Sequence, residues 1–279
     1  MKRSQWVTII FGIGLVLIIY LFGKKTPPDS SNLNTAQGLV SIVSIDTILF
    51  HAKESLTPEQ ITRLQLLESS VTRGDVKSQR LDIYHQLAHF WRDSAGIFEP
   101  YAWYQAEASR LEDSEKTLTF AAHLFLNNLQ GEQNPELRKW KALQAKDLFE
   151  RSLKINKDND SSLVGLGACY IFGGIAENPM EGILKVRQVA EKDSNNVYAQ
   201  LVLGQGSLLS GQYDKAIDRF EFVARNQPEN LEALFRLAEI YERKNEPAKA
   251  ISWYQKALPV LNNPMIKQEI ENRIKSLSE

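Results

Sequence analysis

The chain opens with a long apolar run. Residues 6–22 (WVTIIFGIGLVLIIYLF) carry no charge, and their number is at the short end of what can span a bilayer. Trp6 and Tyr20 lie near the two ends of the run, where membrane interfaces favour aromatic side chains. The run is longer than the apolar region of a signal peptide, and no A-x-A-like cleavage site follows it. The pattern predicts a retained transmembrane helix over residues 1–23, with a cleaved signal peptide as the alternative.

Basic residues flank the apolar run on both sides, so the expected orientation depends on a small difference in positive charge between the two sides. Lys2, Arg3 and the free amine precede it, whereas Lys24 and Lys25 follow it. Positive charge tends to stay in the cytoplasm. We therefore expect a cytoplasmic N-terminus and a folded domain on the other side of the membrane.

The pattern then changes twice before any repeat begins. Residues 24–37 are polar and contain Pro27 and Pro28, as expected of a linker. Residues 38–80 are predicted to pack against the repeats. Within them, 39–50 is apolar and reads equally well as strand or helix. Thr57-Pro-Glu-Gln60 has the spacing of a capping box with Pro at the first helical position, which predicts a helix start.

The C-terminal half repeats itself every 34 residues. This spacing separates Gly204 from Ala238, Ala216 from Ala250, and Phe220 from Tyr254. Small residues at such positions let two helices approach closely, and the aromatic residue fills the space toward the next hairpin. One copy contains Leu203-Gly204, Gly211, Tyr213, Ala216, Phe220 and Pro228, and the next contains Leu237-Ala238, Tyr241, Ala250, Tyr254 and Ala257.

These residues and their 34-residue period resemble the tetratricopeptide-repeat (TPR) family. Earlier copies are weaker: Gly167 with Gly182, Ala122 with Ala145, and Ala88 with Ala102. The resemblance implies an all-α, right-handed superhelical solenoid of about five helix hairpins over residues 81–279. The amphipathic segment 264–277 is expected to cap it.

Composition excludes several functions and supports none of the catalytic ones. The net charge is −1, with acids and bases interspersed, so no basic stripe for nucleic acid is present. Cys169 is the single cysteine, and its apolar neighbours indicate a buried residue rather than a reactive thiol. No phosphate loop or G-x-S-x-G motif occurs. We expect a protein that is not an enzyme and that binds no cofactor.

Histidines offer the one candidate metal site. His85 and His89 lie four residues apart on one predicted helix, and His123 holds the corresponding position in the next hairpin. Such a set could bind zinc, but no Asp or Glu completes it at a matching position. We therefore predict no metal and a polar, pH-sensitive end of the groove.

The repeat register also predicts a partner-binding groove on the concave side of the solenoid. Its middle is apolar, one end carries histidines and an arginine, and the other carries carboxylates. The lining is His85, His89, Arg92, Thr119, His123, Leu126, Val164, Ala168, Ile171, Leu201, Gln205, Leu208, Phe235, Glu239 and Glu242. The Lys and Asn residues with which some family members clamp a C-terminal carboxylate are absent.

An apolar groove suits an amphipathic helix or an extended apolar segment of a protein partner. Alternatively, residues 39–50 of this chain could fill it. The whole layout resembles single-pass TPR proteins of the bacterial cell envelope, which implies an inner-membrane protein with its repeats outside the cytoplasm. The favoured function is an anchored scaffold in envelope assembly or chaperoning. The alternative is a structural subunit of a membrane complex, held by its anchor and convex face.

Overall fold

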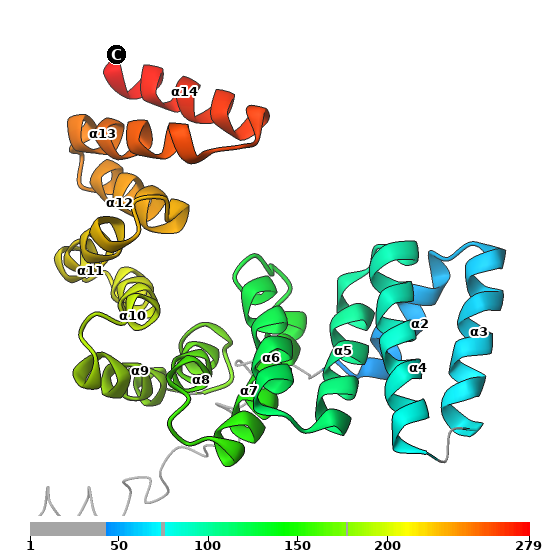
Figure 1. Ribbon diagram of the computed structural model, residues 1–279. Coiled ribbons are helices and arrows are strands. Elements are labelled where there is room, and N and C mark those ends of the chain that lie inside the picture. The colour runs from blue at the N-terminus through cyan, green and yellow to red at the C-terminus, as the bar shows by residue number, and fades with distance from the viewer. Residues whose placement is uncertain (1–42, 74–75, 177) are drawn as a thin grey trace, which may run out of the picture. The chain divides into compact units, whose positions relative to one another are not determined.

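The computed structural model describes residues 43–73, 76–176 and 178–279 (Figure 1). The predicted anchor and linker, and residues 39–42, lie outside the described residues. Among the helices that the structure does describe, none combines the length and apolar character needed to cross a membrane. All regular structure in the described residues is helical, which confirms the predicted all-α class.

Helices follow one another as five packed pairs (Figure 1). The pairs are α4 (Lys77–His89) with α5 (Phe98–Glu112), α6 (Glu115–Leu129) with α7 (Pro135–Ile155), α8 (Asp160–Phe172) with α9 (Met180–Lys192), α10 (Val197–Leu209) with α11 (Tyr213–Asn226), and α12 (Leu231–Arg243) with α13 (Pro247–Ala257). We call the first helix of each pair the A helix and the second the B helix. The five pairs match the number of hairpins that the sequence predicts.

Three further helices flank the pairs. α2 (Ile45–Glu54) packs on α5, α3 (Pro58–Arg73) packs on α4, and α14 (Pro264–Ser278) packs on α13 in the manner expected of a cap. The segment predicted as 38–80 thus holds two helices rather than one, and α4 begins at Lys77 instead of Leu81. Residues 45–50 form part of α2, whose Ile48 and Ala52 are buried. The described part of residues 39–50 therefore packs on α5, which is a B helix. The alternative in which this segment fills a groove of A helices is wrong for these residues.

Helix starts follow local capping chemistry. In the capping box, the Thr57 amide donates to Gln60 Oε1 at 2.9 Å and the Gln60 amide donates to Thr57 Oγ1 at 3.3 Å, as predicted. Asparagine side chains cap α7, α8, α10, α12 and α14. The last four recur at about one repeat length, so the same backbone turn restarts successive elements.

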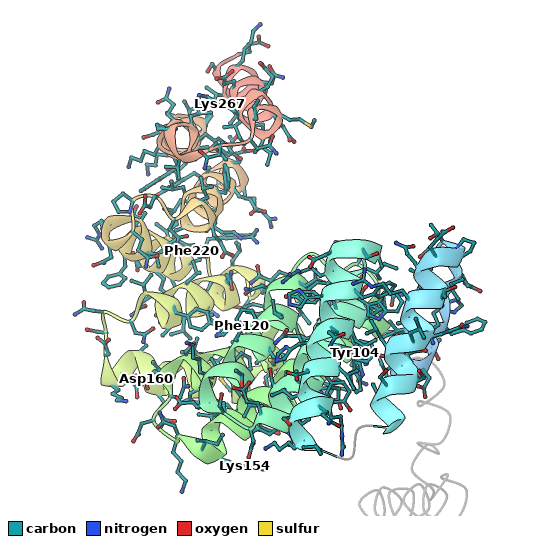
Figure 2. The ribbon with its side chains drawn as sticks, turned by 45° about the vertical axis from the view of Figure 1, so that its right-hand side comes forward. Tyr104, Phe120, Lys154, Asp160, Phe220 and Lys267 are labelled. Carbon is teal, nitrogen blue, oxygen red and sulfur yellow. The ribbon has the colours of Figure 1, made fainter. Side chains whose placement is uncertain are left out.

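Close approach within a pair depends on small residues. A Cβ on Gly167 would lie 2.7 Å from the carbonyl oxygen of Gly182 and 2.4 Å from a methyl of Val186, so α8 and α9 touch almost backbone to backbone. In the next pair, a Cβ on Gly204 would lie 2.9 Å from the ring of Phe220. Figure 2 labels Phe220 on α11. The predicted close approach of paired helices at small residues is confirmed. The ring of Phe220, expected to fill the space toward the next hairpin, contacts Gly204 within its own pair.

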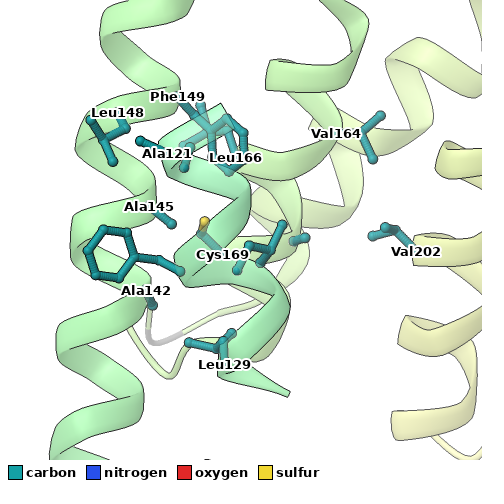
Figure 3. Packing of buried hydrophobic residues seen from close by; sticks show 14 of the residues in the cluster. Ala121, Leu129, Ala142, Ala145, Leu148, Phe149, Val164, Leu166, Cys169 and Val202 are labelled. Carbon is teal, nitrogen blue, oxygen red and sulfur yellow. The ribbon is translucent and has the colours of Figure 1, made fainter. Parts of the chain in front are cut away.

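The largest core runs from α5 to α10, and Figure 3 shows its centre. Cys169 lies there with Ala145, Phe149 and Leu166, and burial raises the pKa of its thiol. A second cluster joins α10 to α13. Because α10 contributes Val202 and Leu203 to the first cluster and Leu201 and Leu208 to the border of the second, it links the two halves of the stack.

Candidate functional site

The fifteen predicted groove residues lie on or beside the A helices, and we call this surface the A-helix face. The structure divides them by exposure and by partners into an N-terminal end, a middle and a C-terminal end. Only part of the predicted lining is available to another molecule.

At the N-terminal end, the predicted residues pair with their own neighbours. His85 is half-buried and His89 is exposed at the end of α4, just before a π-helical turn (Phe90–Ala95). The Arg92 guanidinium approaches His89 Nδ1 at 2.8 Å and donates to Asp93 Oδ1 at 2.7 Å. It also lies 5.6 Å from the ring centre of Tyr101. This end is an exposed, locally neutralised polar surface.

A network of hydroxyl groups occupies the beginning of the middle region. Thr119 Oγ1 lies 2.9 Å from Ser152 Oγ and 3.0 Å from Ser162 Oγ, and the two serines are 2.9 Å apart. Both serines are buried. Thr119 therefore joins α6 to α7 and α8, and its polar group is already used inside the molecule.

The next predicted residue, His123, closes part of the A-helix face. Its Nε2 lies 3.0 Å from Ser161 Oγ on α8, and its ring centre is 5.1 Å from that of Phe149 and 5.6 Å from that of Tyr198 on α10. Burial lowers the pKa of the imidazole. His123 is thus a half-buried linking side chain that connects three A helices.

Four predicted lining residues are buried instead of exposed: Leu126, Val164, Ala168 and Gln205. Figure 3 shows Val164 of α8 and Val202 of α10 in the same apolar cluster. The expectation that these four residues line an open groove is corrected, because neighbouring A helices approach closely enough to cover them. Ile171 is half-buried against the same cluster.

Polar contacts between neighbouring A helices follow a repeated pattern. We count positions from the first residue of each A helix. The side chain at the ninth position of one A helix contacts the side chain at the second position of the next A helix. His123 contacts Ser161 in this way, and Gln205 donates to Glu232. Gln205 also accepts a bond of 3.5 Å from Gln130, at the end of α6. These contacts connect neighbouring A helices, and the side-chain polar groups that make them are no longer free to bind a partner.

The C-terminal end keeps apolar side chains partly exposed. Leu201 and Leu208 on α10 and Phe235 on α12 are half-buried at the border of the second core cluster. Glu239 accepts from Arg236 at 3.0 Å and from Arg243 at 2.7 Å. We call these three apolar residues, with the charged residues beside them on α12, the C-terminal A-face.

Glu242 has a structural partner in the capping helix. It accepts from Tyr254 Oη at 2.7 Å and from Arg273 Nε of α14 at 3.1 Å. The hydrogen bond from Arg273 lowers the pKa of this carboxyl, and the bond from Tyr254 adds to the effect. Glu242 therefore holds the cap against the last pair.

The sequence-based prediction missed the second position of three A helices, α8, α10 and α12. Ser161, Tyr198 and Glu232 occupy it, and each contacts a predicted groove residue or its hydrogen-bond partner. The 34-residue spacing of Tyr198 and Glu232 was a usable signal. Within the ranges that the structure describes, no three His, Cys, Asp or Glu side chains are arranged to hold a metal ion.

Comparison with known proteins supports the repeat assignment. A family model described as "Tetratricopeptide repeat" matches residues 201–262, the last two helix pairs that the sequence identifies most clearly. This model describes a repeat and not a catalytic domain. No curated protein matches the chain.

Several solved structures have similar folds. MamA (residues 41 to the end) from Desulfovibrio magneticus RS-1 has 16% identity and a TM-score of 0.42, covering 64% of this chain and 94% of that one. YrrB, described as a TPR protein with an unusual peptide-binding site, has 17% identity and a TM-score of 0.41, covering 74% and 97%. The Cut9–Hcn1 hetero-tetramer of APC/C has 15% identity and a TM-score of 0.48, covering 79% and 40%. At these values the likenesses carry no argument about the ligand.

Proposed function

We propose that this chain is a non-enzymatic scaffold, and that it binds an apolar segment of a protein partner on the C-terminal A-face. The observation that carries the proposal is the partial exposure of Leu201, Leu208 and Phe235 on adjacent A helices. A TPR-type fold is consistent with protein–protein interaction, and the match to the repeat model covers this surface.

The chemistry of the C-terminal A-face defines the kind of partner. Leu201 and Leu208 lie seven residues apart, on the same side of α10, and Phe235 adds an aromatic surface from α12. Such a surface fits two or three apolar side chains of an amphipathic helix or extended segment. The charges of Arg243, which is exposed, and of the half-buried Arg236 and Glu239 would border the bound segment.

The proposal includes a membrane anchor at the N-terminus and, with it, a location for the repeats. The uncharged run over residues 6–22 and its flanking bases support a single-pass protein of a bacterial inner membrane. In this arrangement the repeats lie outside the cytoplasm and act in envelope assembly or chaperoning. A reporter that is active only in the periplasm, fused after Glu279, tests the orientation. Activity of a reporter that works only in the cytoplasm, fused at the same place, would contradict it.

A structural subunit of a membrane complex is the second candidate. It is favoured by exposed apolar side chains on B helices, such as Leu184 on α9 and Ile155 at the end of α7, which are 55% and 49% exposed. In this case, contacts with other subunits would use the B-helix side and the anchor.

Site-specific photo-crosslinking distinguishes the two candidates. A photo-reactive amino acid replaces Leu208 in the full chain in its native membrane, and the matched control carries it at Ile155. We expect one discrete product at Leu208, absent at Ile155 and reduced by Phe235→Ser. A product at Ile155 alone would instead support the structural subunit and refute binding on the A-helix face.

A further inference from the structure

A pocket on the B-helix side of the fourth pair has no role in the fold or in the proposed function. Its volume is about 320 Å³. The lining is Gln200 from α10 together with Lys215, Asp218, Arg219, Phe222 and Arg225 from α11. On α11 these residues follow a helical stripe beside the buried stripe of Ala216, Phe220 and Val223. Three cations, one carboxylate and one aromatic ring thus share one concavity.

Arg219 is the lining residue whose side chain is held by a hydrogen bond across the pocket-forming helices. Its Nη1 donates to Gln200 Oε1 at 2.6 Å. Burial lowers the pKa of the guanidinium, and the nearby positive charge of Arg187 on α9 lowers it further. In the described part of the chain, neither arginine forms an ion pair with a carboxylate, although Asp218 stabilises the charge of Arg219 from a distance. Among the described residues, these two cations are thus left without an ion-pair partner.

The other two acidic residues of α11 do not relieve this excess because they bond residues of α12 or just after it. Asp214 accepts from Lys244 Nζ at 2.6 Å, and Glu221 accepts from Tyr241 Oη at 3.5 Å. On α12, by contrast, Arg236 and Arg243 share Glu239. The unpaired positive charge around Arg219 is therefore a local feature and does not extend over the neighbouring helices.

We propose that this pocket binds carboxylate side chains of an acidic, aromatic-containing segment of a protein partner. A guanidinium binds a carboxylate through two parallel hydrogen bonds, and Arg219 is held for this by Gln200. Phe222 supplies apolar contact for a neighbouring side chain of the segment. The site is distinct from the C-terminal A-face, and neither proposal depends on the other.

Charge favours a peptide carboxylate over nucleic acid. The pocket lining has a formal charge of +2, from three cations and Asp218, and Arg187 adds one more nearby. Nucleic-acid binding uses an extended basic surface, whereas the whole chain has a net charge of −1.

The test uses the purified full chain and a fluorescein-labelled EDWDE peptide, with a QNWNQ peptide as the uncharged match. Fluorescence anisotropy should show saturable binding of the acidic peptide that weakens as sodium chloride is raised. Arg187→Gln and Arg219→Gln should each weaken binding about tenfold. The control Lys154→Gln removes an exposed cation at the end of α7 and should leave binding unchanged.

Circular-dichroism melting separates binding from folding. Arg187 is exposed, so Arg187→Gln should melt as the wild type does, and its binding result decides the matter even if Arg219→Gln unfolds. Failure of the acidic peptide to bind would overturn the proposal. So would equal loss in Lys154→Gln, equal binding of QNWNQ, or stronger competition by inorganic phosphate or a 20-mer DNA duplex than by unlabelled EDWDE. The crosslink at Leu208 tests the other face independently.

Discussion

The imidazole of His123 and the phenol ring of Tyr198 lie 5.6 Å apart between their centres, although they belong to the second and fourth helix pairs. His123 also contacts Ser161 on α8, between them. One histidine thus connects α6, α8 and α10. The contact closes the middle of the A-helix face and leaves the C-terminal A-face as its open apolar part.

Tyr198 contributes to stability through its ring and not through its hydroxyl. The Oη atom is buried and has no hydrogen-bond partner among the described residues. We expect Tyr198→Phe to leave the free energy of unfolding unchanged or to raise it slightly, because it removes a buried polar group. Tyr198→Ala should cost about 3 kcal/mol, because it opens a cavity. Urea unfolding of both variants measures this, and a large loss in Tyr198→Phe would contradict the assignment.

His123 should make the protein sensitive to mild acid. Burial lowers the pKa of this imidazole from its ordinary value of 6.5, so the unfolded chain binds a proton more readily than the folded one. Stability is therefore lost as pH falls below about 6.5 toward the folded-state pKa. His123→Gln should flatten the change in unfolding free energy between pH 7.5 and 5.5. His51→Gln, which replaces an exposed ring on α2, is the control and should leave that change as in the wild type.

Two glycines on A helices should respond to alanine with opposite signs. At Gly167, a Cβ would collide with Gly182 and Val186 of α9, so Gly167→Ala should cost about 1–3 kcal/mol. At Gly206 on α10, the nearest atom to a Cβ is a methyl of Ile171 at 3.8 Å. Gly206→Ala should therefore stabilise the helix by about 0.5–1 kcal/mol. Thermal melts of the two variants check the signs, and destabilisation of both would show that the two sites are equally crowded.

A buried lysine carries a further stability prediction. Lys141 on α7 is 2% exposed and forms ion pairs with Glu99 at 2.8 Å and Glu132 at 2.6 Å. Lys141→Ala should cost about 3–5 kcal/mol, because it leaves two poorly solvated carboxylates without a partner. The control Lys146→Ala breaks a pair one turn apart with Glu150 and should change stability by about 0.5 kcal/mol or less. Chemical unfolding at pH 7.5 compares them.

The same ion pairs should make the free energy of unfolding depend on pH in the acid range. Burial has the largest single effect and would raise the pKa of Glu132. The hydrogen bond and charge of Lys141, with backbone hydrogen bonds from Asn134 and Gln133, together outweigh it, and the pKa is lowered. The stabilisation is present above the ordinary pKa of a glutamate and is lost as pH falls through the lower folded-state value. Lys141→Met should remove this loss between about pH 4.5 and 3, measured by thermal melts. An unchanged acid profile would show that the pair is not coupled to folding.

The sequence by itself determined the helices of the later repeats, the pairing of neighbours and the capping helix, whereas it left residues 39–50 open between strand and helix. These depend on local signals: the 34-residue spacing of Ala216 and Ala250, the capping box at Thr57, and the amphipathic pattern of residues 264–277. Each acts through bonds or contacts within one repeat or between adjacent repeats. Such interactions depend on short stretches of chain, so a register read from residue types predicts them.

Only the tertiary structure decided which groove positions face solvent and which charges lack partners. Val164 and Leu201 hold the same place in their repeats, yet Val164 is buried and Leu201 is half-exposed. Similarly, Arg219 and Arg243 both lie on helix surfaces, but of these two only Arg243 forms an ion pair, with Glu239. Register gives the direction of a side chain from its own helix. Its exposure and its electrostatic environment depend on side chains from other repeats, because distances between helices are set by all the residues packed between them.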